Sequence, residues 1–367
     1  MSDEIGGSNM NKWKKSFGFI CIMLLFFIML SIYFKGKGRK PVQEKSEEEK
    51  IIIGFAMDTL VHERWLRDRD IFVAKANELG ADVIVQTANS DSQEQEKQVE
   101  YLLKQNIDVL VLVPHDAEKA ASIVKVAKNK GVKVISYDRL VKNANADIYI
   151  SFDNIKVGEL MAKAIVEKVP TGNYLILNGS QSDNNSFMFN EGYKKVLNEK
   201  IHTGDIWIID ETWIKDWLYE DAFKFVDEVL RNNRSIDAII AGNDTLAAAA
   251  INALAERRLA GTLAVVGHDA DLDGCQRIVE GTQLATIYKP IDEIAKITAE
   301  YAVKMAKGGL VQTKETIYDG KYNIPYYKIE PILVTKDNMV ETVIKDQFHA
   351  LEDVYMNIPK SKWPQVD

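Results

Sequence analysis

The sequence predicts an α/β protein built from two doubly wound lobes with parallel sheets, preceded by one hydrophobic N-terminal segment. From residue 51 onward, short apolar runs of β-forming residues alternate with longer stretches whose apolar residues recur at helical spacing. The strand runs are almost continuously apolar, which is typical of parallel strands covered by helices on both faces. The same alternation begins again after Asp153, and it therefore predicts a second lobe.

The first lobe is predicted to contain four strands separated by three helices. The strand runs are IIIGFAM, ADVIVQT, IDVLVLV and VKVISYD, at 51–57, 81–87, 107–113 and 132–138. Helical spacing of apolar residues predicts helices over 61–79, 93–104 and 119–130. Gly80 and Gly131 follow two of these helices, at a position where glycine commonly ends a helix.

The second lobe repeats the pattern with five strands. These are NYLILNG, DIWIIDE, IDAIIAG, TLAVVGH and QLATIYK, at 173–179, 205–211, 236–242, 262–268 and 283–289. Helices are predicted over 157–169, 184–198, 219–231, 245–255 and 272–279, followed by a helix at 291–307 and a late strand at 330–336. Trp207 lies within a predicted strand, so we expect it in the core.

The hydrophobic segment spans residues 17–34 and contains no charged residue. As a helix it would be about 27 Å long, close to the ~30 Å hydrocarbon core of a membrane. Basic residues follow it directly and no small-residue cleavage site separates them, so the pattern favours an uncleaved anchor over a signal peptide. We expect a single-pass protein of the cell membrane with residues 1–16 in the cytoplasm, 35–50 as a linker, and an extracytoplasmic main domain.

The charge distribution argues against nucleic acid as a partner. The chain of 367 residues has a formal net charge of −8, and residues 51–367 carry 37 basic against 48 acidic residues. Nucleic-acid binding depends mainly on lysine and arginine, so a domain this acidic is a poor candidate for it. Residues 51–367 contain one cysteine, Cys275, which excludes an internal disulfide there.

Charged and aromatic residues follow most of the predicted strands. Parallel sheets of this kind bind ligands at the carboxyl ends of their strands, so these residues are the candidate site. They are Asp58, Arg64, Trp65, Asp138, Arg139, Asp183, Asn184, Asn185, Trp213, Trp217, Asn243, Asp244, Asp269 and Lys289. Hydrogen-bond donors, acceptors and aromatic faces in this mixture suit a neutral polyhydroxylated ligand, whose hydroxyls both donate and accept.

Several of these residues have purely structural alternatives. Asp58, Asn184 and Asp244 are each suitable helix N-caps, and Arg139 could simply pair with the adjacent Asp138. Trp213 and Trp217 remain open between packing and binding. The sequence lacks GxGxxG, GxxxxGK[ST] and GxSxG motifs, and its histidines do not form a metal-binding spacing. We therefore expect no cofactor, no metal and no enzymatic activity, with a sugar-modifying enzyme as the weakest alternative.

Seven ordered motifs resemble the D-xylose-binding periplasmic protein family, which has the type I periplasmic-binding-protein fold. They are ERWLRDRDIFVAKANELGADV, YDR, YISFDNIKVGELMAKA, SDNN, WIKDW, GNDTLAAAAINAL and DADLDGCQRIVEGTQLATIYKP. The resemblance implies that the sugar contacts Arg64, Asp138, Arg139, Asp183, Asn185, Asn243, Asp269 and Lys289, and stacks between Trp65 and Trp217. His268 stands where a neutral amide is expected.

The resemblance also implies three passages between the lobes, near Asp153, near Lys289 and near 314–320. The expected N-terminal lobe is 51–153 plus 290–315, the C-terminal lobe is 154–289 plus 316–346, and 347–367 is a tail. The hypothesis is a membrane-tethered receptor for D-xylose that signals by lobe closure to a histidine kinase. Delivery of the sugar to an ABC permease is the alternative.

Overall fold

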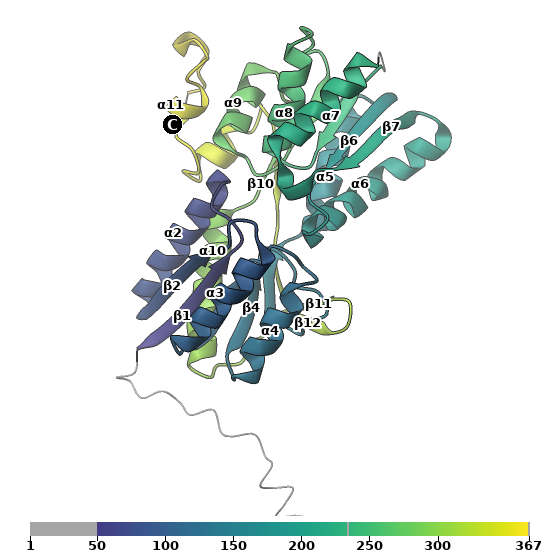
Figure 1. The fold of residues 1–367 in the computed structure, drawn as a ribbon. Coiled ribbons are helices and arrows are strands. Elements are labelled where there is room, and N and C mark those ends of the chain that lie inside the picture. Colours follow the sequence, from purple (N-terminus) through teal and green to yellow (C-terminus); the bar gives the residue numbers. More distant parts are fainter. Residues whose placement is uncertain (1–49, 233–234, 366–367) are drawn as a thin grey trace, which may run out of the picture. The chain divides into compact units, whose positions relative to one another are not determined.

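The computed structural model describes residues 50–232 and 235–365, which form two lobes of mainly parallel sheets and covering helices (Figure 1). The N-terminal lobe contains a seven-stranded sheet in the order β11-β12-β5-β4-β3-β1-β2. Its strands are β1 (Ile51–Met57), β2 (Ala81–Thr87), β3 (Val109–Leu112), β4 (Lys133–Tyr137), β5 (Ile148–Phe152), β11 (Glu315–Tyr318) and β12 (Asn323–Ile329). Its helices are α2 (Glu63–Glu78), α3 (Ser92–Lys104), α4 (Ala120–Asn129) and α10 (Ile291–Ala306).

Helices cover both faces of this sheet, and strand β1 shows why its sequence is apolar throughout. Phe55 of β1 packs in one cluster with Phe72 of α2 and Ile294 of α10. Ala56, the next residue, packs in a second cluster with Leu102 of α3. Successive side chains of a strand point to opposite faces, so a strand buried on both faces needs apolar residues at consecutive positions.

The C-terminal lobe contains a four-stranded sheet in the order β7-β6-β8-β9 and a two-stranded sheet of β10 and β13. The strands are β6 (Gly172–Asn178), β7 (Ile206–Trp213), β8 (Ala238–Ala241), β9 (Ala264–Val266), β10 (Thr286–Tyr288) and β13 (Ile332–Val334). The helices are α5 (Asn154–Lys168), α6 (Asn184–Thr203), α7 (Tyr219–Arg231), α8 (Asp244–Ala255), α9 (Leu272–Glu280) and α11 (Leu351–Val354). Short 3₁₀ or π turns lie at Lys215–Trp217, Val340–Ile344 and Lys360–Lys362.

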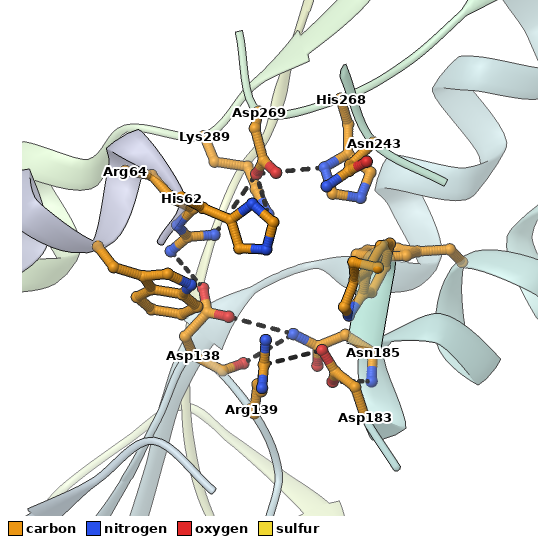
Figure 2. A pocket seen from close by; sticks show the side chains of 13 residues that line it. His62, Arg64, Asp138, Arg139, Asp183, Asn185, Asn243, His268, Asp269 and Lys289 are labelled. Carbon is orange, nitrogen blue, oxygen red and sulfur yellow. Dashed lines mark hydrogen bonds and ion pairs between the residues drawn. The ribbon is translucent and has the colours of Figure 1, made fainter. Parts of the chain in front are cut away.

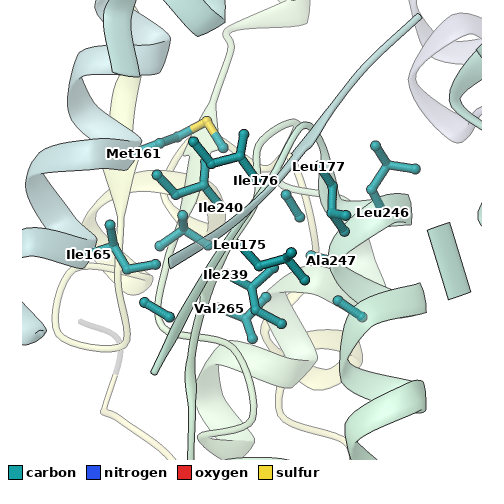
Figure 3. Close-up of a cluster of buried hydrophobic side chains, with 14 of the residues drawn as sticks. Met161, Ile165, Leu175, Ile176, Leu177, Ile239, Ile240, Leu246, Ala247 and Val265 are labelled. Atoms are coloured by element: carbon teal, nitrogen blue, oxygen red, sulfur yellow. The ribbon is translucent and has the colours of Figure 1, made fainter. Parts of the chain in front are cut away.

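The core of this lobe follows the same alternation (Figure 3). Ile176 of β6 lies on the side of Met161 from α5, whereas Leu175 lies on the side of Ala247 from α8. The two helices therefore cover opposite faces of the sheet. The expected two lobes of the α/β class are confirmed, and their strands are mostly parallel; β11 with β12 and β10 with β13 pair antiparallel.

One predicted boundary is wrong. Strands β11 and β12 belong to the N-terminal-lobe sheet, where β12 runs parallel to β5 with Tyr326 opposite Tyr149. The rings of these two tyrosines stack with their centroids 4.9 Å apart. The N-terminal lobe therefore extends to Ile329, and the third passage between the lobes lies at 330–331 instead of near 314–320. Residues 316–329, which were expected in the second segment of the C-terminal lobe, instead extend the first sheet.

The expectation that Trp207 lies in the core is also wrong, because its side chain is 64% exposed. β7 is the outermost strand of its sheet, so one of its sides has no neighbouring strand. The indole Nε1 of Trp207 donates a hydrogen bond to the carbonyl of Gly204 at 3.1 Å. A residue inside an edge strand can face solvent, and the apolar pattern alone does not distinguish that case.

The C-terminal segment, expected as a tail, packs against both lobes. Arg67 of α2 lies over the ring of Phe348 at 4.5 Å and donates hydrogen bonds to the carbonyls of Gln347, at 3.2 Å, and of Phe348. The ring of Phe348 contacts Tyr288 with 4.9 Å between centroids. His349 Nε2 lies 2.8 Å from the carbonyl oxygen of Ala270, next to the candidate residue Asp269.

The predicted membrane anchor at 17–34 lies outside the described residues. Within 50–232 and 235–365, no helix is both long enough and apolar enough to cross a membrane.

Candidate ligand-binding site

All ten residues that the resemblance selected line one cavity (Figure 2). They come from the start of α2, the end of β4, the start of α6, the turn at Lys215–Trp217, the start of α8 and the loops after β9 and β10. The complete lining is His62, Arg64, Trp65, Asp138, Arg139, Asp183, Asn185, Phe189, Trp217, Asn243, His268, Asp269 and Lys289. Both lobes therefore contribute walls to the same cavity.

Arg64 of the N-terminal lobe is the centre of a buried charge cluster. Its Nη2 lies 2.7 Å from Asp138 Oδ2, and its Nη1 lies 3.5 Å from Asp269 Oδ1 of the other lobe. Lys289 Nζ is 2.7 Å from the same Asp269 oxygen. Asp68, one turn further along α2, accepts from Arg64 Nε at 3.3 Å and so orients the guanidinium from behind.

The two cavity carboxylates in this cluster are held in their ionised form. Burial by itself would raise the pKa of Asp269, but Lys289, His268 and Arg64 outweigh burial and hold the pKa well below its ordinary value. Burial likewise acts to raise the pKa of Asp138, and Arg64 and Lys289 bring the net pKa below its ordinary value. Both groups are therefore hydrogen-bond acceptors at neutral pH.

Arg139 belongs to a second ion chain that joins the lobes. Its Nε lies 2.8 Å from Asp183 Oδ2, and its Nη1 lies 2.7 Å from Asp58 Oδ2. The other oxygen of Asp58 lies 2.8 Å from His115 Nδ1. Asp58 is thus an ion-pair partner and not a helix cap, and Arg139 pairs with these two carboxylates and not with the adjacent Asp138.

The remaining cap alternatives are resolved by hydrogen bonds at two helix starts. Asp183, not Asn184, caps α6 by accepting from the Asn185 backbone N–H at 2.9 Å. Asn243 caps α8 by accepting from the Leu246 N–H at 2.8 Å. Asp244 is fully buried beneath it, where it accepts from Gln283 at 2.7 Å and from Thr286 at 2.8 Å.

Asn185 is oriented by a network of hydrogen bonds to residues of both lobes. Its Nδ2 donates to the backbone carbonyl of Asp138 at 3.2 Å. Its Oδ1 accepts from Asn154 Nδ2 at 3.1 Å and from the Tyr149 hydroxyl at 3.4 Å. With its amide thus fixed, Asn185 holds the strand end of the first lobe against the helix start of the second.

The aromatic lining residues come from both lobes, Trp65 from the first and Phe189 and Trp217 from the second. Trp65 lies under the Arg64 guanidinium, 4.2 Å from the ring centroid, and Trp217 meets the Phe189 ring edge-on at 6.4 Å. Trp213 does not line this cavity, because its ring contacts Phe187 at 4.7 Å instead.

The backbone at the site adopts uncommon conformations. Asp138, Trp217 and Asp269 have positive φ angles of 59°, 58° and 103°. Residues other than glycine seldom adopt such angles, and they tend to occur at functional sites where the surrounding structure maintains the strain. No sequence pattern used here indicates these angles.

Sequence reasoning left the lining residues His62 and Phe189 out of the site, and it treated His268 only as a neighbour of the ligand residue Asp269. His268 directly precedes Asp269 in the sequence, and the neighbour of a predicted site residue is expected to lie near the site. Phe189 falls four residues after Asn185 on α6, so it lies on the same helix face. His62 directly precedes α2 and has no comparable signal.

The cavity volume is about 30 Å³, roughly what one or two water molecules need. A neighbouring hollow of about 490 Å³ shares His62, Arg139 and Trp217 with it and is lined by both lobes. The site can therefore exchange a larger ligand with solvent only when the lobes or the lining side chains move.

The chain matches the family described as "Periplasmic binding protein domain" over residues 53–310. It is 45% identical to the D-xylose-binding periplasmic protein of Haemophilus influenzae over 304 residues, which are 83% of this chain and 92% of that protein. Identity to the D-xylose-binding periplasmic protein of Escherichia coli K12 is also 45%, over 82% of this chain and 92% of the relative.

Solved structures agree with the fold. A carbohydrate transporter solute-binding protein from Chloroflexus aurantiacus, in complex with D-glucose, superposes with a TM-score of 0.77 at 28% identity, covering 83% of this chain and 98% of that chain. The xylose-binding relatives are named as binding proteins and not as enzymes, which agrees with the expectation of no catalytic activity. The chain belongs to the type I periplasmic binding protein family, within which it is similar over most of its length to D-xylose-binding periplasmic proteins.

Proposed function

We propose that this chain binds D-xylose or a closely related aldopentose in the cavity between its lobes. The observation that carries the proposal is the convergence of buried ionised carboxylates, cations, amides and two tryptophans from both lobes on one cavity. The names of the two 45% identical relatives support xylose as the ligand.

The chemistry of the lining matches a pyranose. Asp138 and Asp269 are acceptors for sugar hydroxyls, and Arg64 and Lys289 are donors to them. Charge-assisted hydrogen bonds are stronger than neutral ones, and a carboxylate has two oxygens that can receive neighbouring hydroxyls. The apolar C–H faces of the ring would pack on Trp65 and Trp217, which bury large areas at low entropic cost.

Lobe closure follows from where the contacts originate. Arg64 and Asp138 belong to the N-terminal lobe, whereas Asn243 and Asp269 belong to the C-terminal lobe. A sugar can contact both sets only when the lobes are together, so it stabilises the closed arrangement by its better contacts there. The passages at 153–154, 289–290 and 330–331 are the hinge in this proposal.

Calorimetry with the purified chain tests the ligand. D-xylose is expected to bind with an affinity of order micromolar, about 8 kcal/mol. D-ribose, D-glucose and D-galactose serve as comparison sugars. Clear heat with one of them and none with xylose would contradict the xylose assignment.

We further propose that residues 17–34 anchor the chain in the membrane with the lobes outside the cytoplasm. The run of uncharged apolar residues followed by basic residues supports an anchor. A reporter fused after the C-terminus is expected to be active on the outer side of the membrane. Mass spectrometry that found cleavage between residues 34 and 50 would contradict the anchor.

The closed form would then present a surface to a membrane partner, such as the extracytoplasmic domain of a histidine kinase. Tethering raises the effective concentration of such a partner. Delivery of sugar to an ABC permease is the second candidate, supported by the name of a similar solved structure, an ABC transporter solute binding protein from Clostridium phytofermentans with bound β-D-glucose. Only a partner that contacts both lobes, or one lobe and the hinge, distinguishes open from closed.

A titration of the purified chain with the kinase domain, with and without xylose, separates the two candidates. Xylose is expected to strengthen association with the kinase domain. Equal association in both conditions would remove the signalling mechanism and leave the permease as the partner.

Gly179→Ala is expected to reduce xylose affinity by about tenfold or more, because an ideal Cβ at this position would lie 2.0 Å from the Trp217 ring. Such overpacking forces a side chain out of place at a cost of roughly 1–3 kcal/mol. The measurement is calorimetric xylose binding, with unfolding by urea as a check of stability.

Gly80→Ala is the matched control. Gly80 has a φ of +84° but no atom within 4 Å of its ideal Cβ, so alanine there strains the backbone without contacting the site. We expect it to lower stability slightly and to leave the xylose affinity unchanged. Equal loss of affinity in both variants would show that Trp217 placement is not the cause.

A further inference from the structure

The lining of the cavity contains buried polar atoms that the protein itself leaves without hydrogen bonds. Among the side chains of residues 50–232 and 235–365, Trp217 Nε1 and His268 Nε2 are buried in this lining without a hydrogen-bond partner. Leaving a buried polar group unsatisfied costs roughly 1–3 kcal/mol. Such atoms in the wall of a cavity point to a ligand that supplies the missing hydrogen bonds.

His268 is held in one place by its neighbours. The residue is 2% exposed, and its ring meets Phe189 edge-on with 4.5 Å between centroids. Trp217 meets it edge-on from another direction at 6.1 Å. Its backbone carbonyl accepts from the Asp244 N–H at 2.9 Å, which ties it to the start of α8. The ring therefore cannot turn away to find a partner elsewhere.

Its charge state and tautomer follow from the same surroundings. Burial lowers the pKa of His268, and Lys289 and Arg64 lower it further against the opposing effect of Asp269, so the ring is neutral at neutral pH. The ionised Asp269 has an oxygen 3.2 Å from Nδ1 and can only accept. The single ring proton therefore resides on Nδ1, and Nε2 is left as an acceptor.

We propose that His268 is a specificity residue whose Nε2 accepts a hydrogen bond from one particular hydroxyl of the bound sugar. This inference rests on the proposed function. The nitrogen differs from the other acceptors of the site because it is uncharged and has a single lone pair, whereas Asp138 and Asp269 each present two oxygens. It therefore accepts a hydrogen bond from one hydroxyl, and a sugar that lacks that hydroxyl leaves Nε2 buried and without a hydrogen bond.

The test pairs two variants of the full-length chain with four analogues of xylopyranose, each lacking one hydroxyl. His268→Phe removes both nitrogens and keeps an aromatic ring between Phe189 and Trp217. His268→Gln restores a neutral acceptor. Affinities are measured by calorimetry and, for weak analogues, by quenching of tryptophan fluorescence at neutral pH. Thermal unfolding establishes that each variant is folded.

For xylose, His268→Phe is expected to bind about 10- to 100-fold more weakly than the unaltered chain, and His268→Gln to recover most of that loss. For three analogues, the loss caused by His268→Phe should be as large as for xylose. For the fourth analogue it should fall to about onefold, because the partner hydroxyl is already missing. A purely structural role would reduce all affinities by the same factor.

An equal loss across all four analogues, or no loss with xylose, would overturn the inference. If His268→Phe does not fold, His268→Gln still decides it, since an amide should change the ranking of the four analogues when His268 contacts a hydroxyl. Failure of the unaltered chain to bind xylose would instead overturn the proposed function, and this inference with it.

Discussion

Asp269→Ala is expected to weaken xylose binding by roughly 2–5 kcal/mol, about 30- to several thousandfold. The carboxylate accepts from Lys289 at 2.7 Å and lies 3.5 Å from Arg64, and all three side chains are buried. Its removal takes away an acceptor for sugar hydroxyls and leaves the buried Lys289 without its carboxylate partner, while Arg64 keeps Asp138 and Asp68. Calorimetric titration with xylose measures the effect.

Trp207→Phe is the control for this prediction. The side chain is 64% exposed on the edge strand β7, so the substitution is expected to change neither stability nor affinity appreciably. An Asp269→Ala affinity within threefold of that of the unaltered chain would exclude Asp269 from the binding machinery. A loss of affinity in Trp207→Phe would place the ligand elsewhere.

Arg139→Met is expected to lower the free energy of unfolding by about 3–5 kcal/mol and to abolish measurable xylose binding. The guanidinium lies between Asp58 and Asp183, one from each lobe, at 2.7 and 2.8 Å. Methionine fills a similar volume but leaves Asp183 without its guanidinium partner and Asp58 with His115 alone. Urea unfolding at neutral pH measures the loss of stability.

The pH dependence of this loss gives an independent check. With Arg139 present, burial acts to raise the pKa of Asp58, but Arg139 and His115 bring it below its ordinary value. Its stabilising contribution is therefore present above the unfolded pKa near 3.8 and disappears as the pH falls through the lower folded value. Without Arg139 the pKa of Asp58 in the folded state rises. The difference in the free energy of unfolding between Arg139→Met and the unaltered chain should therefore become smaller at acidic pH.

Lys119→Met provides the matched comparison. Lys119 pairs with Asp116 at 3.1 Å, but its side chain is 71% exposed, and such pairs contribute at most about 1 kcal/mol. Similar losses in the two variants would mean that the buried ion chain does not stabilise the lobes. If the loss in the free energy of unfolding of Arg139→Met stayed constant from neutral to acidic pH, the uncompensated carboxylates would be excluded as its cause.

Most helices and strands could be predicted because they satisfy local rules. The strands that are buried on both faces, such as β1 and β3, are continuous apolar runs, and the helix α7 begins and ends where its apolar spacing does. The ten residues that the resemblance selected could be assigned to a ligand site because they follow predicted strands, and parallel strands present their carboxyl ends at one edge of each sheet. These features depend on residues close together in the chain.

The elements that sequence reasoning missed depend on partners distant in the chain. β5 was not predicted as a strand, and β12 contains Pro325, an uncommon residue in strands. β12 joins the first sheet by pairing with β5, more than a hundred residues earlier in the chain, with Tyr326 opposite Tyr149. The third passage between the lobes moved to 330–331 for the same reason.

By itself, the sequence determined the α/β class, the restart into a second lobe and the residue types gathered at the strand ends. Only the tertiary structure decided which lobe β11 and β12 extend, that Arg139 pairs with Asp58 and Asp183, and that Trp207 faces solvent. The physical reason is the separation along the chain of the residues that determine each feature. Hydrophobic periodicity and strand-end position are local properties, whereas sheet edges and ion pairs between lobes depend on which distant segments come within a few ångströms of each other.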